Sequence, residues 1–208
     1  MEPLFAFTAA LIALRLSGLL VARWRLARRP ELAAWAAGLL AFAVASAALA
    51  WGAAAGWDDH AFRVYYLFGG LLTAPLLGLG SLLLAGHRWA LPAALVYVGL
   101  AVGVGVASPL HGAIAGMSIP AAQDHFAFFP ARLVAVVGNS VGTAAVVAVA
   151  IATIKRRPLG NTLVLAGIAV AAVGTGLSGL GTAKTSVFAA IAALLLYGGF
   201  TASARRSP

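Results

Sequence analysis

The chain contains seven long apolar stretches that are separated by short polar connections. They cover residues 3–22, 31–55, 61–85, 90–110, 131–154, 160–181 and 185–204. The hydrocarbon core of a bilayer is about 30 Å thick, and a helix crosses it in roughly 20 residues. In lipid every backbone amide needs a partner within the protein, and a helix provides one for most residues. The sequence therefore predicts an all-α, polytopic membrane protein with seven transmembrane helices.

The composition agrees with a protein that is dissolved in a lipid bilayer. Apolar residues make up 62% of the 208 residues and charged residues 9%, whereas soluble domains have about 45–50% and about 25%. The seven stretches use most of the chain, so we expect one domain over residues 1–208. Cysteine is absent, which excludes disulfides, thiolate metal ligands and cysteine nucleophiles.

Charged residues are distributed unevenly between alternate connections. One set of connections and the tail contain Arg23, Arg25, Arg28, Arg29, Arg88, Lys155, Arg156, Arg157, Arg205 and Arg206. The other set contains Asp58, Asp59, Asp124 and a single lysine, Lys184. Because Lys and Arg concentrate on the cytoplasmic side, this pattern predicts an extracytoplasmic N-terminus and a cytoplasmic C-terminus in the plasma (inner) membrane of a bacterial-type cell. It also explains the net charge of +9 without a nucleic-acid partner.

Two pairs of segments suggest a parallel internal repeat. ARRPELAAWAAG (27–38) resembles KRRPLGNTLVLAG (155–167), and YYLFGG (65–70) resembles LLYGG (195–199). Predicted helices 1–3 and 5–7 would then form two three-helix units joined by the fourth helix, a 3+1+3 plan that occurs in transporters. The alternative is that any cytoplasmic helix start has basic residues, a proline and many alanines.

No catalytic or cofactor motif is present, so an enzyme is not the expected class. The chain contains no Walker loop, no Ser/His/Asp motif and no nucleotide fingerprint. It has no lysine in the middle of the last stretch, no Pro-Gln pair and no His-x-x-x-His motif. It therefore lacks the signatures of retinal proteins, PQ-loop transporters and seven-helix zinc hydrolases. The topology that it shares with these families is only an analogy without their motifs.

Polar residues within three of the apolar stretches are candidates for a solute site. Arg15 lies near the middle of the first stretch, where an arginine costs about 2.5–3.5 kcal/mol. In the fifth stretch, a seven-residue and a four-residue spacing place Arg132, Asn139 and Thr143 on one helix face. The alternatives are that Arg15 extends to the interface and that Asn139 and Thr143 only join helices.

The third stretch combines a polar face with a proline. Tyr66 and Thr73 share a face, Arg63 lies one turn before Tyr66, and Pro75 predicts a kink near mid-membrane. A kinked helix beside polar side chains is a common setting for a transporter site, although Tyr66 could also belong to an interfacial aromatic belt.

These patterns favour a small-solute, permease-like transporter with a central polar cavity for an anionic or polar neutral ligand. We expect no cofactor, and the expected partners are the lipid bilayer and a small molecule. The candidate ligand-binding residues are Arg15, Arg63, Tyr66, Thr73, Arg132, Asn139 and Thr143.

Two other functions stay open. Six outer residues have side chains suited to a divalent metal or haem in a membrane protein or enzyme: Asp58, Asp59, His60, His111, Asp124 and His125. A sensor or assembly partner whose helices only pack is the third possibility. Gly52/Gly56, Gly99/Gly103 and Gly138/Gly142 have GxxxG spacing, which permits homo-oligomer contacts. The apolar segment HFAFF (125–129) is expected either to lie at the membrane interface or to fold back over the bundle mouth as a lid.

Overall fold

The computed structural model describes residues 2–176 and 182–202, which form helices and their connections. The elements are α1 (Glu2–Ala27), α2 (Pro30–Ala55), α3 (Asp59–Tyr65), the π-helix η1 (Tyr66–Leu72), α4 (Thr73–Leu84), α5 (Ala90–Ala107), α6 (Ala122–His125), the π-helix η2 (Phe128–Arg132), α7 (Leu133–Ala152), α8 (Pro158–Gly176) and α9 (Thr182–Ala202). Side chains of residues 175–184 are not described. The predictions for Lys184, Arg205 and Arg206 therefore fall outside what the structure describes, and these residues enter only the charge pattern of the sequence.

The helices are long enough to cross a membrane, as the sequence predicts. Within the described residues, six are long and apolar enough: 2–27, 30–55, 59–84, 90–107, 128–152 and 185–202. A further apolar helix covers residues 158–174, and this part is shorter than the other six helices. An all-α protein with several helices that are long and apolar enough to cross a membrane is thus confirmed, whereas a seventh crossing and the internal repeat stay predictions.

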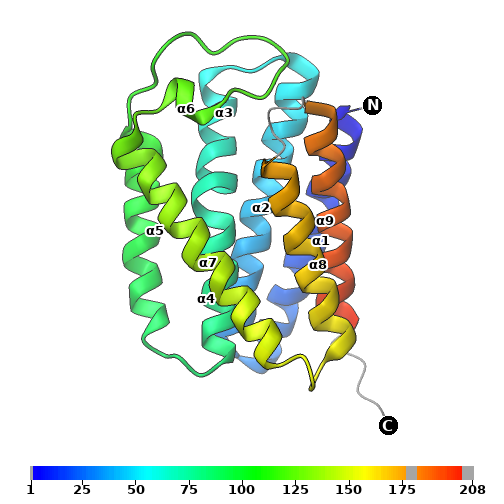
Figure 1. Cartoon of the computed structure of the whole chain (residues 1–208). Coiled ribbons are helices and arrows are strands. Elements are labelled where there is room, and N and C mark those ends of the chain that lie inside the picture. Colours follow the sequence, from blue (N-terminus) through cyan, green and yellow to red (C-terminus); the bar gives the residue numbers. More distant parts are fainter. Residues whose placement is uncertain (1, 177–181, 203–208) are drawn as a thin grey trace.

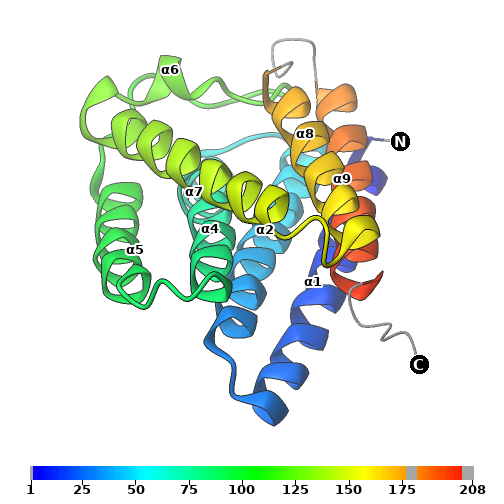
Figure 2. The same cartoon turned by 60° about the horizontal axis from the view of Figure 1, so that its bottom comes forward.

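The helices stand side by side, with α5 at one edge of the bundle and α8 and α9 towards the other (Figure 1). The α1 helix packs along α2 and α9, and α9 packs against α8. The α4 helix lies between α2 and α7, and α7 crosses it obliquely (Figures 1 and 2). A set of five helices, α2, α4, α7, α8 and α9, therefore surrounds the middle of the protein.

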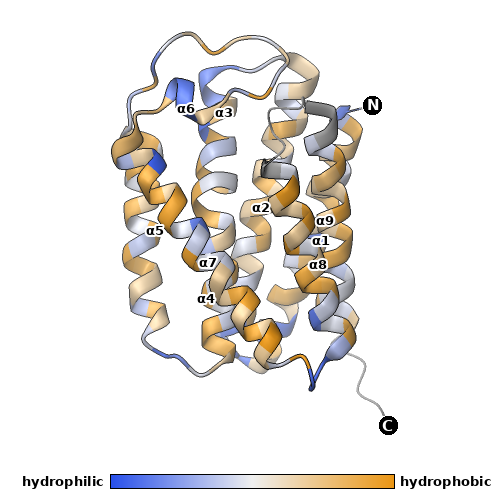
Figure 3. Cartoon of the chain, viewed as in Figure 1, coloured by the Kyte–Doolittle hydropathy of each residue, from blue (hydrophilic) through white to orange (hydrophobic). Residues whose placement is uncertain are grey.

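The two ends of the bundle differ in charge. The α1–α2, α4–α5 and α7–α8 connections lie together at the lower end in Figure 1, and we name this the basic end. The α2–α3 connection and the long segment 108–127 lie together at the other end, named the opposite end. Hydrophilic colours gather at these connections in Figure 3, while the helices between them are largely hydrophobic. The structure thus groups the basic connections as the sequence predicts.

Local sequence signals explain where the helices begin and end. The α2 and α8 helices start at Pro30 and Pro158, where a proline costs no hydrogen bond and has the required φ. Asp58 Oδ1 accepts the Ala61 N–H at 2.7 Å and caps α3. Gly56 ends α2 with a φ of +92°, a left-handed conformation that favours glycine.

Two of the three GxxxG pairs contribute to packing inside the chain. Gly138 faces Tyr97 of α5, and Gly142 faces the backbone of Ala74 and Pro75 in α4. Gly52 faces the indole of Trp57. Among the glycines of these three pairs, only Gly99 and Gly103, on the outer face of α5, have no neighbour within 4 Å of an added Cβ atom. A homo-oligomer contact through Gly138/Gly142 is therefore excluded by this packing, and the α5 pair stays available.

Candidate functional site

The helical segment from α3 to α4 is distorted where Pro75 interrupts its hydrogen bonds. Proline has no N–H, so the carbonyl of Leu71 loses its helical partner. Tyr97 Oη donates to Leu71 O at 2.8 Å, from α5. Asn139 Nδ2 donates to Gly70 O at 2.7 Å, from α7. Side chains of two neighbouring helices thus hydrogen-bond to the backbone at the kink that the sequence predicts.

A cavity of about 390 Å³ lies beside this distorted segment. Residues of α2, α3, η1, α4, α7, α8 and α9 line it. Its polar lining consists of Ser46, Tyr65, Tyr66, Thr73, Asn139, Thr143 and Thr185, and the remainder is aliphatic, aromatic or glycine. No lining residue in the described part of the chain carries a formal charge.

One of these hydroxyl groups has no hydrogen-bond partner among the described residues. Thr185 is 7% exposed, and its Oγ1 is buried without a partner there. Ser46, which is 3% exposed, and Thr143 place two further hydroxyl groups at the cavity. Because an unpaired buried hydroxyl costs about 1–3 kcal/mol, the cavity favours water or a solute that hydrogen-bonds.

Apolar residues pack beside the cavity towards both ends. Phe126, 2% exposed, packs against Phe62 and Tyr66 with ring centroids 5.6 and 4.6 Å apart. The cluster of Leu16, Leu20, Ala36, Leu39, Leu77, Val146 and Leu196 lies towards the basic end. Phe126 of HFAFF thus packs on a residue that lines the cavity, whereas Phe128 and Phe129 are exposed, and a lid stays a prediction.

The structure brings four of the seven predicted ligand-binding residues together. Tyr66, Thr73, Asn139 and Thr143 all line the central cavity. Thr73 Oγ1 donates to Phe68 O at 2.7 Å, and Asn139 Nδ2 donates to Gly70 O. Part of the hydrogen-bonding capacity of these two side chains is therefore already used by backbone carbonyls. Sequence reasoning missed Ser46 and Thr185, although a lone serine in the Ala-rich second stretch was a usable signal.

The three predicted arginines lie elsewhere, which corrects the expectation of a cavity lined by cations. Arg63 Nη1 donates to the carbonyls of Gly105, Val106 and Ser108 at 3.2, 3.2 and 2.9 Å. It thus binds the C-terminal end of α5, where a positive charge is favourable. Arg132 lies 5.6 Å from the Phe128 ring centroid, and Arg15 is exposed on α1.

The outer histidines and carboxylates do not converge. His111 N donates to His125 O at 2.9 Å, and His125 Nδ1 lies 3.0 Å from His111 O. These contacts join the two ends of the 108–127 segment, and Asp58 caps α3. Asp59, His60 and Asp124 are exposed. Within residues 2–176 and 182–202 no group of three or more such side chains is arranged to hold a metal, so the metal or haem site stays a prediction from sequence alone.

Comparisons of the chain with models of protein families, with curated proteins and with solved structures gave no match.

Proposed function

We propose that the protein is a small-solute, permease-like transporter whose central cavity binds a polar neutral solute. The observation that supports it is the cavity of about 390 Å³, with several hydroxyl groups in its lining, the Thr185 hydroxyl unpaired, and no charged lining residue in the described chain. Its volume is in the range of small-molecule sites, which are mostly apolar with a few convergent polar groups.

The lining favours a neutral solute over the anionic one that the sequence left open. A charge taken out of water needs a counter-charge or several strong hydrogen bonds. Arg15, Arg63 and Arg132 are not among the lining residues. Hydroxyl groups both donate and accept, so they suit alcohols, amides or similar neutral groups on a largely apolar body.

Transport further requires that the cavity open to each side in turn. The proposed barriers are Phe126, which packs on the lining residue Tyr66, and the cluster around Leu77, Val146 and Leu196. We propose that these two barriers open alternately around a fixed site, as in other transporters. A helix kinked by Pro75 beside the cavity supports this, because its backbone is already interrupted.

The proposal includes a single seven-helix domain, with the basic end in the cytoplasm and the N-terminus outside the plasma membrane. Its support is the grouping of Arg28, Arg29, Arg88, Arg156 and Arg157 at one end. The 3+1+3 repeat belongs to the same proposal, since α5 at the edge leaves six helices for two units of three. Reaction of Asp59→Cys, and not Arg88→Cys, with an impermeant reagent outside sealed cells checks the orientation.

Filling the cavity tests the proposed function. Purified protein is heated with a panel of neutral alcohols, amides and sugars and, separately, with organic anions. We expect at least one neutral solute to raise the unfolding midpoint of the native protein and to have no effect on Thr143→Phe, because the larger ring occupies the solute's place. Val141→Phe, on the exposed face of the same helix, is the control and keeps the response. An unchanged response of Thr143→Phe, or a response to anions alone, contradicts the proposal.

A further inference from the structure

A second cavity, of about 610 Å³, lies at the basic end of the bundle. Residues from α1, α2, α4, α7, α8, α9 and two connections line it. Among the described residues, Val146 is the only one that borders both this cavity and the central one. The two cavities are therefore separate sites with separate chemistry.

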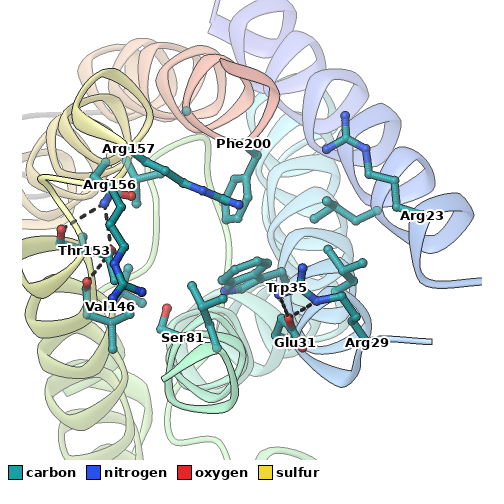
Figure 4. Close-up of a pocket in the computed structure, with 18 of the residues that line it drawn as sticks. Arg23, Arg29, Glu31, Trp35, Ser81, Val146, Thr153, Arg156, Arg157 and Phe200 are labelled. Carbon is teal, nitrogen blue, oxygen red and sulfur yellow. Dashed lines mark hydrogen bonds and ion pairs between the residues drawn. The ribbon is translucent and has the colours of Figure 1, made fainter. Parts of the chain in front are cut away.

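Four guanidinium groups surround this second cavity (Figure 4). Arg23 comes from α1, Arg29 from the α1–α2 connection, and Arg156 and Arg157 from the α7–α8 connection. The chain thus folds arginines more than 120 residues apart in sequence around one space. Lys155 and Arg88, which are equally exposed at the same end, do not line it.

One carboxylate accompanies the four arginines. Glu31 is 5% exposed and forms an ion pair with Arg29, whose Nε donates to Glu31 Oε1 at 2.6 Å. In the described part of the chain Arg23, Arg156 and Arg157 have no acidic partner. The cavity therefore has an excess of positive charge, and Glu31 serves to hold Arg29 rather than to neutralise the others.

Aromatic side chains form the wall between the two groups of arginines. Trp35 and Phe200 pack edge to face, with ring centroids 5.1 Å apart. In Figure 4 they lie between Arg23 and Arg29 on one side and Arg156 and Arg157 on the other, and Arg157 extends towards Phe200. The lining thus combines a cationic rim with an apolar surface, as a ligand with a charged head and an apolar body requires.

The positions of two helix starts add to the positive potential. The α2 and α8 helices, of 26 and 19 residues, both begin at this cavity. Their N-terminal dipole ends favour anions. Guanidinium groups bind phosphate oxygens in a forked geometry, so a phosphate ester is the anion that this arrangement suits best.

We infer that the cavity at the basic end binds a phosphate ester with an apolar body. Arg23, Arg156 and Arg157 contact the phosphate, and Trp35 and Phe200 contact the apolar part. Setting the membrane orientation requires only that arginines lie in these connections; it does not require four of them to converge on a cavity with an aromatic wall. The ligand is either the headgroup region of an anionic phospholipid or a soluble phosphate ester.

The test uses the full-length protein in phosphatidylcholine nanodiscs, and the unfolding midpoint is the readout. Phenyl phosphate is titrated in one arm, and phosphatidylglycerol replaces part of the lipid in the other. We expect at least one of them to raise the midpoint of the native protein. For Arg156→Gln/Arg157→Gln, at least tenfold more of the same ligand is needed for the same rise. Both residues are exposed, and the midpoint without ligand checks that this variant folds.

The control is Arg88→Gln/Lys155→Gln, which removes two charges from the same end outside the cavity. It is expected to respond as the native protein does. A rise with phosphatidylglycerol alone identifies the lipid headgroup as the source, and a rise with phenyl phosphate in phosphatidylcholine identifies a soluble ester. No rise with either, or an equal loss in the control, overturns the inference. The outcome of this test does not depend on the central cavity, because none of the four residues that it changes lines that cavity.

Discussion

Replacing Gly142 with leucine is expected to lower the free energy of unfolding by about 3 kcal/mol or more, the upper range for overpacked cores. A Cβ atom at Gly142 would meet the carbonyl of Ala74 and the nitrogen of Pro75, and Gly78 in turn faces Gly142 from α4. These are backbone atoms, which cannot move aside as a side chain can. The α4–α7 contact that forms one wall of the central cavity therefore depends on this glycine.

Unfolding of the purified protein in mild detergent, followed by circular dichroism, measures the effect. Gly99→Leu and Gly103→Leu are matched controls, because both glycines also lie within a helix that is long and apolar enough to cross a membrane and have open space around them. We expect these two variants to stay within about 1 kcal/mol of the native protein, the scale of glycine's helix propensity. If Gly142→Leu is as stable as Gly99→Leu, the close packing of α4 on α7 is wrong.

Asn139→Leu is expected to destabilise the protein by about 1–3 kcal/mol, the cost of a buried acceptor without its partner. Asn139 donates to Gly70 O at 2.7 Å across 69 positions of sequence, and leucine has a similar volume without a donor. The kink at Pro75 leaves few other donors nearby. Tyr97→Phe, which removes the bond to Leu71 O, is expected to have an effect of the same size.

Thr162→Val is the control for these two variants. Thr162 donates to Pro158 O within its own helix and is exposed, so the loss of its hydroxyl is expected to change stability by about 0.5 kcal/mol or less. Unfolding in the same detergent compares all three. If Asn139→Leu and Thr162→Val do not differ, the hydrogen bonds between helices do not support the kinked segment.

Helical periodicity was sufficient to predict part of the central site. Residues four or seven apart must share a helix face, so Asn139 and Thr143 are brought together whatever their neighbours are. Tyr66 and Thr73 follow the same rule, although η1 changes the local pitch. The helix positions were predictable for a similar reason, because the thickness of lipid dictates the length of an apolar run.

The role of an arginine could not be predicted in the same way. The acceptors of Arg63 lie 42–45 positions away in sequence, at the end of α5, and no local pattern indicates them. The sequence pattern identifies Arg23 and Arg157 only as orientation signals, which accounts for the end of the bundle at which they lie but not for their convergence on one cavity. Thr185 was missed because its importance depends on which helices face it.

The most direct test of the central cavity is its reaction with a small, water-soluble thiol reagent. The natural chain has no cysteine, so a single introduced cysteine gives an unambiguous signal. In sealed membranes, with Asp59→Cys and Arg88→Cys as markers for the two sides, we expect Thr143→Cys to react and to be protected by the neutral solute that stabilises the protein. Val141→Cys, which faces outwards two residues away, stays unreacted, because thiolates do not form in lipid. Failure of Thr143→Cys to react, or equal reaction at both positions, would contradict a central solute site.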